Sequence, residues 1–579
     1  MLRSLPGVLD ACVVTEEEQG RPWLGALVVT EHSVAAVRRL AAMRLPTYLL
    51  PRVVAVVQRL PVTHNGKLDR AAASRYLKQT SLQDPGQGGH QMTPQLEDLL
   101  TAVSRMTGST PSPSSRLDDL GLDSIAVMDL ATSLRHPVPG GRVWQVSVRD
   151  LVESPSIADA ALRMRQSVDQ YPGDSRGDSP TFVLARLARA HVANSGEALA
   201  SMAQSQLVTL PEEGMPQLQH MTESLLAALV AAHPSLTARL DDNGSELVAG
   251  GLPPVVDILP ADHSLAEARA AGVRCLDPWR GPLCAASVRL GAPGRPPVLL
   301  LTVHHLAVDV VSWHILAEDI QRFGSGLEVV PESLVPADSS AMLNRDLPDR
   351  RPLGPTLASR HCDPRLDVGI EPVVCRRVAS ATTSAVLGMA RDGLGVDDIL
   401  GVVTAWTDRE FAATRRDPAG EELWFTIEVH GREGLEESRA VGWFTAELTR
   451  RAPVPQTLDA GWIARTVAAS SEDEEALAAS CLNYLGRMDL LSAWVDTPWQ
   501  VLDPGEALAE LGAPEMDGMP ARFSMTVTAH VEATAEGPVL VASFAGARGL
   551  LGEAQIEEYA TRWLRNVALS VNDMEEKDR

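Results

Sequence analysis

Lysine, cysteine and aromatic residues are scarce in this chain of 579 residues. Aromatic residues make up 4% of it, and its lysines are Lys67, Lys78 and Lys577. The six cysteines are scattered, with no CxxC pair and no cluster at metal-site spacing, so the sequence predicts no metal centre. A reduced, cytoplasmic protein is the simplest interpretation of that cysteine pattern.

Long hydrophobic runs are also missing. No stretch approaches the roughly 20 apolar residues that a membrane helix needs, and the residues after Met1 form no signal-peptide core. The net charge is -24 and the isoelectric point is about 5.0. This excess of negative charge argues against nucleic acid, and against an anionic membrane surface, as a main partner.

What is present is enough apolar material for several folded units. A hydrophobic content of 45% is sufficient for packed cores, and the length predicts several domains. The segment 79–92, which contains the run DPGQGG, and the segment 168–180, which is rich in Gly, Asp and Ser, are both interpreted as linkers. They divide the chain into units at 1–80, 93–167 and 179–572.

Residues 1–80 are expected to form a small α/β unit. Strand-like segments at 8–14, 24–30 and 53–57 are separated by a polar turn over 15–20 and a helical segment over 33–43. The unit closes on LPVTHNGKLDR, where the tight-turn dipeptide Asn-Gly precedes Lys67. A lysine on such a turn can hold an anion in a neighbouring cleft, although an exposed, solvated lysine is the commoner case.

This closing stretch resembles the end of an adenylation domain, LPxTxNGKxDR, in which Lys67 would be the catalytic lysine. The resemblance covers only the C-terminal subdomain of that family. The Gly-rich phosphate loop and the amino-acid pocket do not precede it, since Met1 falls inside the family pattern. We therefore expect no adenylation by this chain alone, and an adenylation core supplied in trans or missing.

Residues 93–167 are expected to be helical. Thr93 is a plausible N-cap with Pro94 at the first helical position, and a second apolar periodicity begins after Ser124. Free N–H groups and partial positive charge at a helix start favour a phosphate, although an ordinary N-cap serine would explain Ser124 alone. The run GLDSI, with VSVRDL and SPSI downstream, resembles a peptidyl carrier protein. That resemblance implies a four-helix bundle with 4'-phosphopantetheine joined covalently to Ser124 by a phosphopantetheinyl transferase.

The region 179–572 is expected to be one large α/β domain. Within it, His304 and His305 follow the buried strand-like run PVLLL, and Asp309 precedes a helix expected over 313–323. Imidazole exchanges protons near neutral pH, since its ordinary pKa is about 6.5, although two satisfied histidines at a strand end are the commoner case. The spacing HHxxxDxxSW resembles the signature of epimerization domains in nonribosomal peptide synthetases.

A carboxylate stands at the end of another apolar strand, WFTIEVHGRE. Burial of Glu428 would raise its pKa and suit it to acid–base chemistry, whereas a salt bridge to an arginine is the alternative. The stretch resembles the epimerase motif EGHGRE with Val429 in place of Gly. Two later runs, VGWFT over 441–445 and LNYLG over 482–486, resemble the motifs that follow in the same family.

The resemblance implies two lobes of the chloramphenicol acetyltransferase-like fold with the site in the channel between them. The reaction would invert the α-carbon of an aminoacyl or peptidyl thioester held on the carrier. His305 and Glu428 would be the two opposed acid–base groups, with His304 in support. Asp309 would hold its loop through an arginine. Asn483 and Tyr484 would be candidate donors to the thioester oxygen.

Two other functions stay open on the sequence. A related condensation domain would form peptide bonds, and a catalytically decayed pair of lobes would serve only as a platform for the carrier. Val310 and Val429 replace family glycines beside the expected catalytic groups, which keeps the second possibility open. As partners, the resemblance implies a carrier-bound amino acid or peptide and the condensation domain of the following module.

Overall fold

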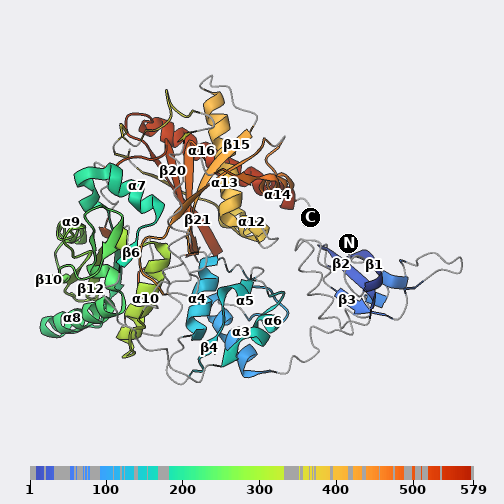
Figure 1. The fold of residues 1–579 in the computed structure, drawn as a ribbon, viewed down its shortest axis with the longest axis horizontal. Coiled ribbons are helices and arrows are strands. Elements are labelled where there is room, and N and C mark those ends of the chain that lie inside the picture. Colours follow the sequence, from blue (N-terminus) through green and yellow to red (C-terminus); the bar gives the residue numbers. More distant parts are fainter. Residues whose placement is uncertain are drawn as a thin grey trace.

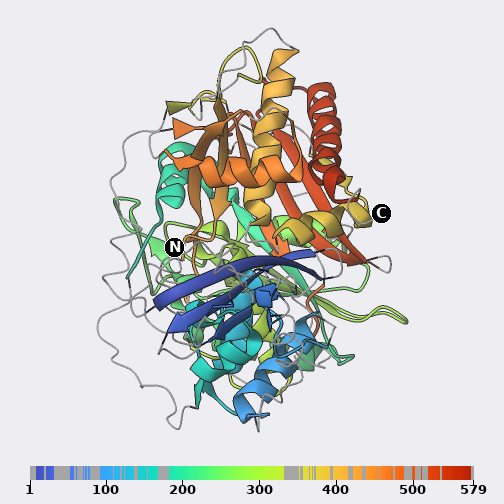
Figure 2. The ribbon, with the colours of Figure 1, turned by 90° about the vertical axis from the view of Figure 1, so that its right-hand side faces the viewer.

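The structure is a computed structural model, and its architecture is drawn in Figures 1 and 2. The described residues are 8–18, 21–30, 53–57, 60–61 and 70–77, then 92–166, 181–331 and 351–575, apart from short gaps, the longest being 136–140, 391–394, 415–421, 433–438, 488–498, 503–509 and 512–518.

The N-terminal unit contains a three-stranded sheet, as expected. Strands β1 (Val8–Glu18) and β2 (Arg21–Thr30) form an antiparallel hairpin, and β3 (Val53–Val56) runs parallel to β2. The prediction of a polar turn over 15–20 is too long, because the strand pairing continues through Thr15 to the oppositely charged pair Glu18 and Arg21. The expected helix at 33–43 and Lys67 lie outside the described residues.

The region 92–166 is helical, with helix starts where its sequence pattern indicates. Helix α3 (Pro94–Thr107) begins at the expected residue, and the Leu96 amide donates to the Thr93 hydroxyl at 3.3 Å. Helix α4 (Ser124–Arg135) begins at Ser124, and α5 (Val148–Val152) and α6 (Ile157–Arg163) follow. Apolar side chains spaced along these helices share one buried core.

The first lobe of the large domain is organised on a four-stranded sheet in the order β10-β11-β12-β7. Its fully buried strand β12 ends at His304, with α8 and α9 packed nearby (Figure 1). Helix α10 begins three residues earlier than expected, because the side chain of Asp309 caps it. The elements are β7 (Ala203–Thr209), β10 (Val255–Leu259), β11 (Cys284–Arg289), β12 (Val298–His304), α8 (Met215–Ala232), α9 (Leu265–Arg274) and α10 (Val310–Gly324).

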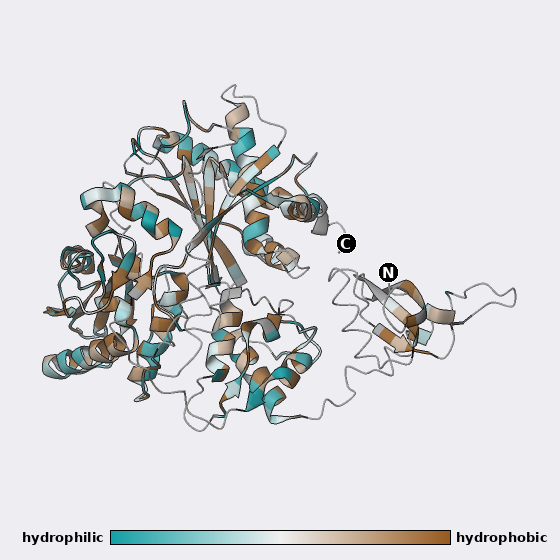
Figure 3. Cartoon of the chain, in the orientation of Figure 1, coloured by the Kyte–Doolittle hydropathy of each residue, from teal (hydrophilic) through white to brown (hydrophobic). Residues whose placement is uncertain are grey.

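The second lobe is a seven-stranded sheet in the order β14-β21-β20-β19-β15-β16-β17. Apolar residues at alternate positions of these strands form a separate core with the helices of this lobe. Figure 3 colours the ribbon by the hydropathy of each residue. The strands are β14 (Val374–Arg377), β15 (Glu422–Val429), β16 (Ala446–Pro453), β17 (Ser471–Glu472), β19 (Ser480–Arg487), β20 (Met525–Thr534) and β21 (Gly537–Gly546). The helices are α12 (Ser380–Ala390), α13 (Val396–Ala413), α14 (Ala460–Ala469) and α16 (Glu553–Glu575).

The two lobes are tied together by a crossing segment. Residues 499–502, which follow β19 in the chain, reach the sheet of the first lobe. The Thr209 amide donates to the Gln500 carbonyl at 2.8 Å, and the ring of Trp499 lies 5.7 Å from that of Phe323. Residues 499–502 therefore connect the second lobe to the sheet of the first.

Candidate active site

His304 is a buried structural residue. Its Nε2 donates to the Leu199 carbonyl at 2.8 Å, and its Nδ1 accepts from the Leu306 amide at 3.2 Å. Burial lowers the pKa of His304 to about 4, so the ring is neutral at physiological pH. Both ring nitrogens are used to shape the chain at the end of β12, which fits the supporting place expected for this residue.

His305 opens a short 3₁₀ helix, His305–Ala307, and faces the junction of the lobes. Its ring stacks on that of Trp443 from the second lobe, with centroids 4.1 Å apart and planes 28° apart. Nδ1 lies 2.9 Å from the Val308 carbonyl and Nε2 lies 2.9 Å from the side-chain nitrogen of Gln204. Burial lowers the pKa of His305, so the neutral imidazole is favoured near pH 7.

Asp309 joins the lobes rather than facing a substrate. One oxygen accepts from the amide and hydroxyl of Ser312, each at 2.8 Å, and from Arg432 at 2.8 Å. The other accepts from the Phe444 amide at 3.0 Å. The arginine partner expected from the sequence is thus Arg432, and both members of the ion pair are 1% exposed.

Glu428 lies one residue before the end of β15, beside two polar residues. In register with it are Glu447 on β16 and Asn483 on β19, so the three side chains share one face of the sheet. Arg522 pairs with Glu447 through two contacts of 3.0 and 2.8 Å, and not with Glu428. Burial first, and the Glu447 charge second, raise the pKa of Glu428 to about 8, against an opposing effect of Arg522.

Asn483 and Tyr484 are separated by the alternation of the strand. Asn483 is on the face that carries Glu428, whereas Tyr484 packs against the core of the second lobe with Leu482. Of the two candidate oxygen donors, the structure brings only Asn483 to the Glu428 side.

His191 links the two halves of the site, and no motif in the sequence pointed to it. It lies on α7 (Arg186–Ser195), and its ring is 5.3 Å from that of Trp443. Burial, then the charge of Arg522, lower the pKa of His191 to about 3, while Glu447 opposes them and His305 adds to them. His305 and the two charged groups that act on Glu428, Glu447 and Arg522, therefore all act on this one histidine.

The two valines that replace family glycines pack on the lobe cores. Val310 is half-buried against the core of the first lobe, and Val429 against that of the second. Val429 alternates with Glu428 along β15, so its side chain is directed to the opposite face. Its extra bulk is accommodated by the core.

Helix α4 lies against β19 of the second lobe, the strand that carries Asn483. Asp129 of α4 is 2.6 Å from Nδ1 of His314 on α10, and these side chains are 17% and 4% exposed. Ser124 is the first residue of α4, although its side chain is not among those described. Ser124 thus begins a helix that is seated on the two-lobed domain.

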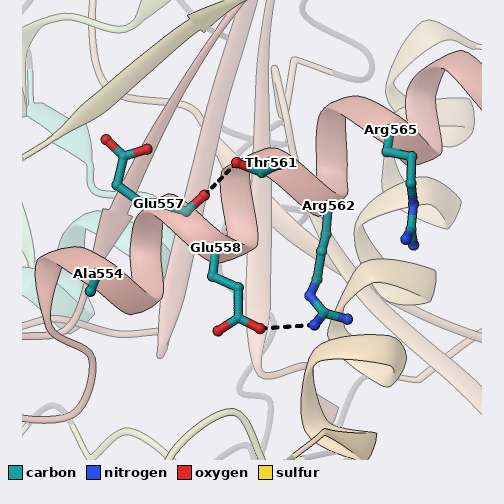
Figure 4. Close-up of a pocket in the computed structure, with 6 residues that line it drawn as sticks. All are labelled: Ala554, Glu557, Glu558, Thr561, Arg562 and Arg565. Carbon is teal, nitrogen blue, oxygen red and sulfur yellow. Dashed lines mark hydrogen bonds and ion pairs between the residues drawn. The ribbon is translucent and has the colours of Figure 1, made fainter.

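The depression on α16 is a weaker candidate for a functional site than the junction of the lobes. A shallow depression of about 480 Å³ on α16 is lined mainly by charged residues, and Arg562 pairs with Glu558 there (Figure 4). Arg565 pairs with Glu410 of α13. Helix α16 packs against α13, away from the face of Glu428. Within the described ranges, no group of three or more His, Cys, Asp or Glu side chains could hold a metal, and no helix is long and apolar enough to cross a membrane.

Comparison with protein families identifies two of the units. Residues 1–67 match the AMP-binding enzyme C-terminal domain, and residues 97–163 match the phosphopantetheine attachment site. Nonribosomal peptide synthetase 5 of Gibberella zeae is 25% identical over 500 residues, which cover 74% of this chain and 4% of that protein. The match therefore concerns a small part of a much longer relative.

Solved structures are similar to the large domain in fold. The epimerization domain from the third module of tyrocidine synthetase B gives a TM-score of 0.51 at 16% identity, over 71% of this chain and 100% of that one. The X-domain from teicoplanin biosynthesis gives a TM-score of 0.51 at 15% identity, and the match covers 70% of this chain and 97% of that domain. The shared fold is thus established, and it hosts differently named domains.

Proposed function

Because the chain belongs to the nonribosomal peptide synthetases, we propose that it inverts the α-carbon of an aminoacyl or peptidyl thioester carried on Ser124. The carrier domain indicates covalently bound 4'-phosphopantetheine, which supplies the thioester that acidifies the α-proton when it is loaded. Ser124 would hold it at the first residue of α4, and the contact of α4 with β19 keeps that residue beside the two-lobed domain.

The observation that carries the proposal is the placement of His305 against Trp443 at the lobe junction and of Glu428 on the sheet face that also carries Asn483, and the burial of both groups sets their protonation. Burial favours neutral His305, whereas Glu428, with its pKa raised to about 8, keeps a proton at pH 7. An unprotonated base and a protonated acid are what a two-base inversion needs, since one group removes the α-proton and the other returns a proton to the opposite face.

The roles follow from these states. His305 takes the α-proton through its unprotonated nitrogen, and Glu428 donates its proton to the α-carbon from the other side. Asn483, in register with Glu428, is placed to donate a hydrogen bond to the thioester oxygen as negative charge develops there. Asp309 and Arg432 keep the lobes in the arrangement that brings these groups together.

The experiment is a chirality assay on the full chain. After loading Ser124 with an L-aminoacyl group, we expect an L/D mixture, and the same mixture from the D-form. His305→Ala and Glu428→Gln should each lower the rate about 10²- to 10⁴-fold with carrier loading intact. The Gln206→Leu variant, on β7, is the matched control.

Two results would refute the proposal. Wild-type protein that neither inverts nor exchanges the α-proton in D₂O, with several loaded amino acids, would favour a platform without chemistry. Transfer of the loaded group to the amine on a second carrier would identify a condensation activity instead.

A further inference from the structure

The side chain of Gln204 lies against Nε2 of His305, and Gln204 belongs to none of the sequence motifs. It lies on β7 in register with Val303 of β12, one strand away from the histidine loop. Its side-chain nitrogen is 2.9 Å from His305 Nε2, and its side-chain oxygen is 2.6 Å from the indole nitrogen of Trp313. Three side chains therefore form a chain of hydrogen bonds that ends at the imidazole.

The direction of this hydrogen-bond chain is fixed by its two ends. The Trp313 indole can only donate, so the Gln204 atom that it meets is the carbonyl oxygen. The Gln204 amide group then donates to His305 Nε2. At the other end the Val308 carbonyl can only accept, so His305 carries its proton on Nδ1.

From this geometry we infer that Gln204, oriented by Trp313, is a positioning residue that holds His305 as the Nδ1–H tautomer with Nε2 unprotonated. The inference rests on the proposed function for its catalytic meaning, since Nε2 is then the nitrogen that takes the α-proton. A proton on Nε2 would face the N–H of Gln204 at 2.9 Å, and turning the amide would break its bond to Trp313. Both effects oppose protonation of Nε2 in the resting protein and so keep His305 in its base form.

Other charged and titratable groups surround His305 and act with Gln204. Asp309, in its own loop, raises the pKa of His305, whereas burial lowers it more. His305 lowers the pKa values of His191 on α7 and of His304, its neighbour in the chain. Both of these histidines are neutral near pH 7. From the second lobe, Trp443 covers one face of the ring without contributing charge.

The test replaces the amide by groups of known effect. Gln204→Glu keeps the shape and an acceptor for Trp313 but turns the partner of Nε2 into a carboxylate. A carboxylate at that distance favours the imidazolium, so the titration midpoint of His305 should rise by about one to three pH units. Gln204→Leu should raise the His305 midpoint less and should remove the preference for the Nδ1–H tautomer. Trp313→Phe should also remove that preference.

The measurement is histidine ¹⁵N and ¹³C NMR of the full chain, with the His305 signal identified by its loss in His305→Asn. Wild type should show the Nδ1–H tautomer and a midpoint below the ordinary value of about 6.5. Gln206→Leu, on the same strand two residues away, should leave both unchanged. The acidic limb of the pH–rate profile should move upward with the midpoint in Gln204→Glu.

Two findings would overturn the inference. One is that His305 of the wild-type protein is the Nε2–H tautomer. The other is that Gln204→Glu leaves the titration midpoint of His305 unchanged. The NMR signal does not depend on turnover, so it separates this inference from the proposed function. If the titration responds as stated and no inversion is found, the proposed function fails alone. If inversion is found and the titration does not respond, the positioning role fails alone.

Discussion

Replacing Glu447 by Gln should shift the pH dependence of inversion to lower pH. Glu447 is in register with Glu428, and its charge is the second cause, after burial, of the raised pKa of about 8. Its removal takes away a like charge and leaves Arg522 without its carboxylate partner. An opposite charge nearby typically lowers a carboxyl pKa by about 1–3 units, so the Glu428 pKa should fall by about one to two units.

The sign of the rate change follows from the role of Glu428 as an acid. Its protonated form is required, so activity is lost as pH rises through its pKa. At pH 7.5 a group of pKa 8 is about three-quarters protonated, whereas pKa values of 7 and 6 give about 24% and 3%. The inversion rate of Glu447→Gln at pH 7.5 should therefore be about 3- to 25-fold lower than that of wild type and recover toward pH 6.

The assay is the rate of L-to-D conversion on the loaded carrier between pH 5.5 and 9.5. Glu422→Gln is the control, because Glu422 is on the same strand but exposed and in register with Pro453. It should leave the alkaline limb near pH 8. An alkaline limb in Glu447→Gln that is unmoved, or shifted to higher pH, would refute the reasoning on Glu428.

Three further outcomes are expected. Incubation with a phosphopantetheinyl transferase and coenzyme A should add one phosphopantetheine mass, and Ser124→Ala should abolish it in intact-mass spectra. Asp309→Asn should destabilise the domain by about 3–5 kcal/mol in urea unfolding, because it leaves buried Arg432 without a counter-ion, and adding Arg432→Met should recover part of the loss. Burial raises the pKa of Asp408 to about 7, above its unfolded value of about 3.9, so stability should fall by about 3 kcal/mol from pH 5 to 8, and Asp408→Asn should remove that fall.

Local patterns in the sequence were sufficient for the elements that carry the site. The apolar run before His304 predicted the buried β12, the run before Glu428 predicted β15, and Ser124 was predicted at the start of a helix. These succeeded because strand and helix periodicities, and the chemistry of helix caps, are short-range properties. The start of α10 was misplaced because the cap at Asp309 is part of a contact that also involves the second lobe.

The partners of those residues were decided only by the tertiary structure. Gln204 precedes His305 by 101 positions, and Arg432 follows Asp309 by 123, so no spacing rule connects them. Gln204 belongs to none of the sequence motifs, and although Arg432 lies within one, its pairing with Asp309 arises only when the two lobes are packed together. Strand pairing likewise separated Asn483 from Tyr484 and set Glu447 beside Glu428. The sequence thus determined where the acid–base groups stand on their own elements, whereas packing of the two lobes determined their protonation states, because burial and neighbouring charges are properties of the assembled domain.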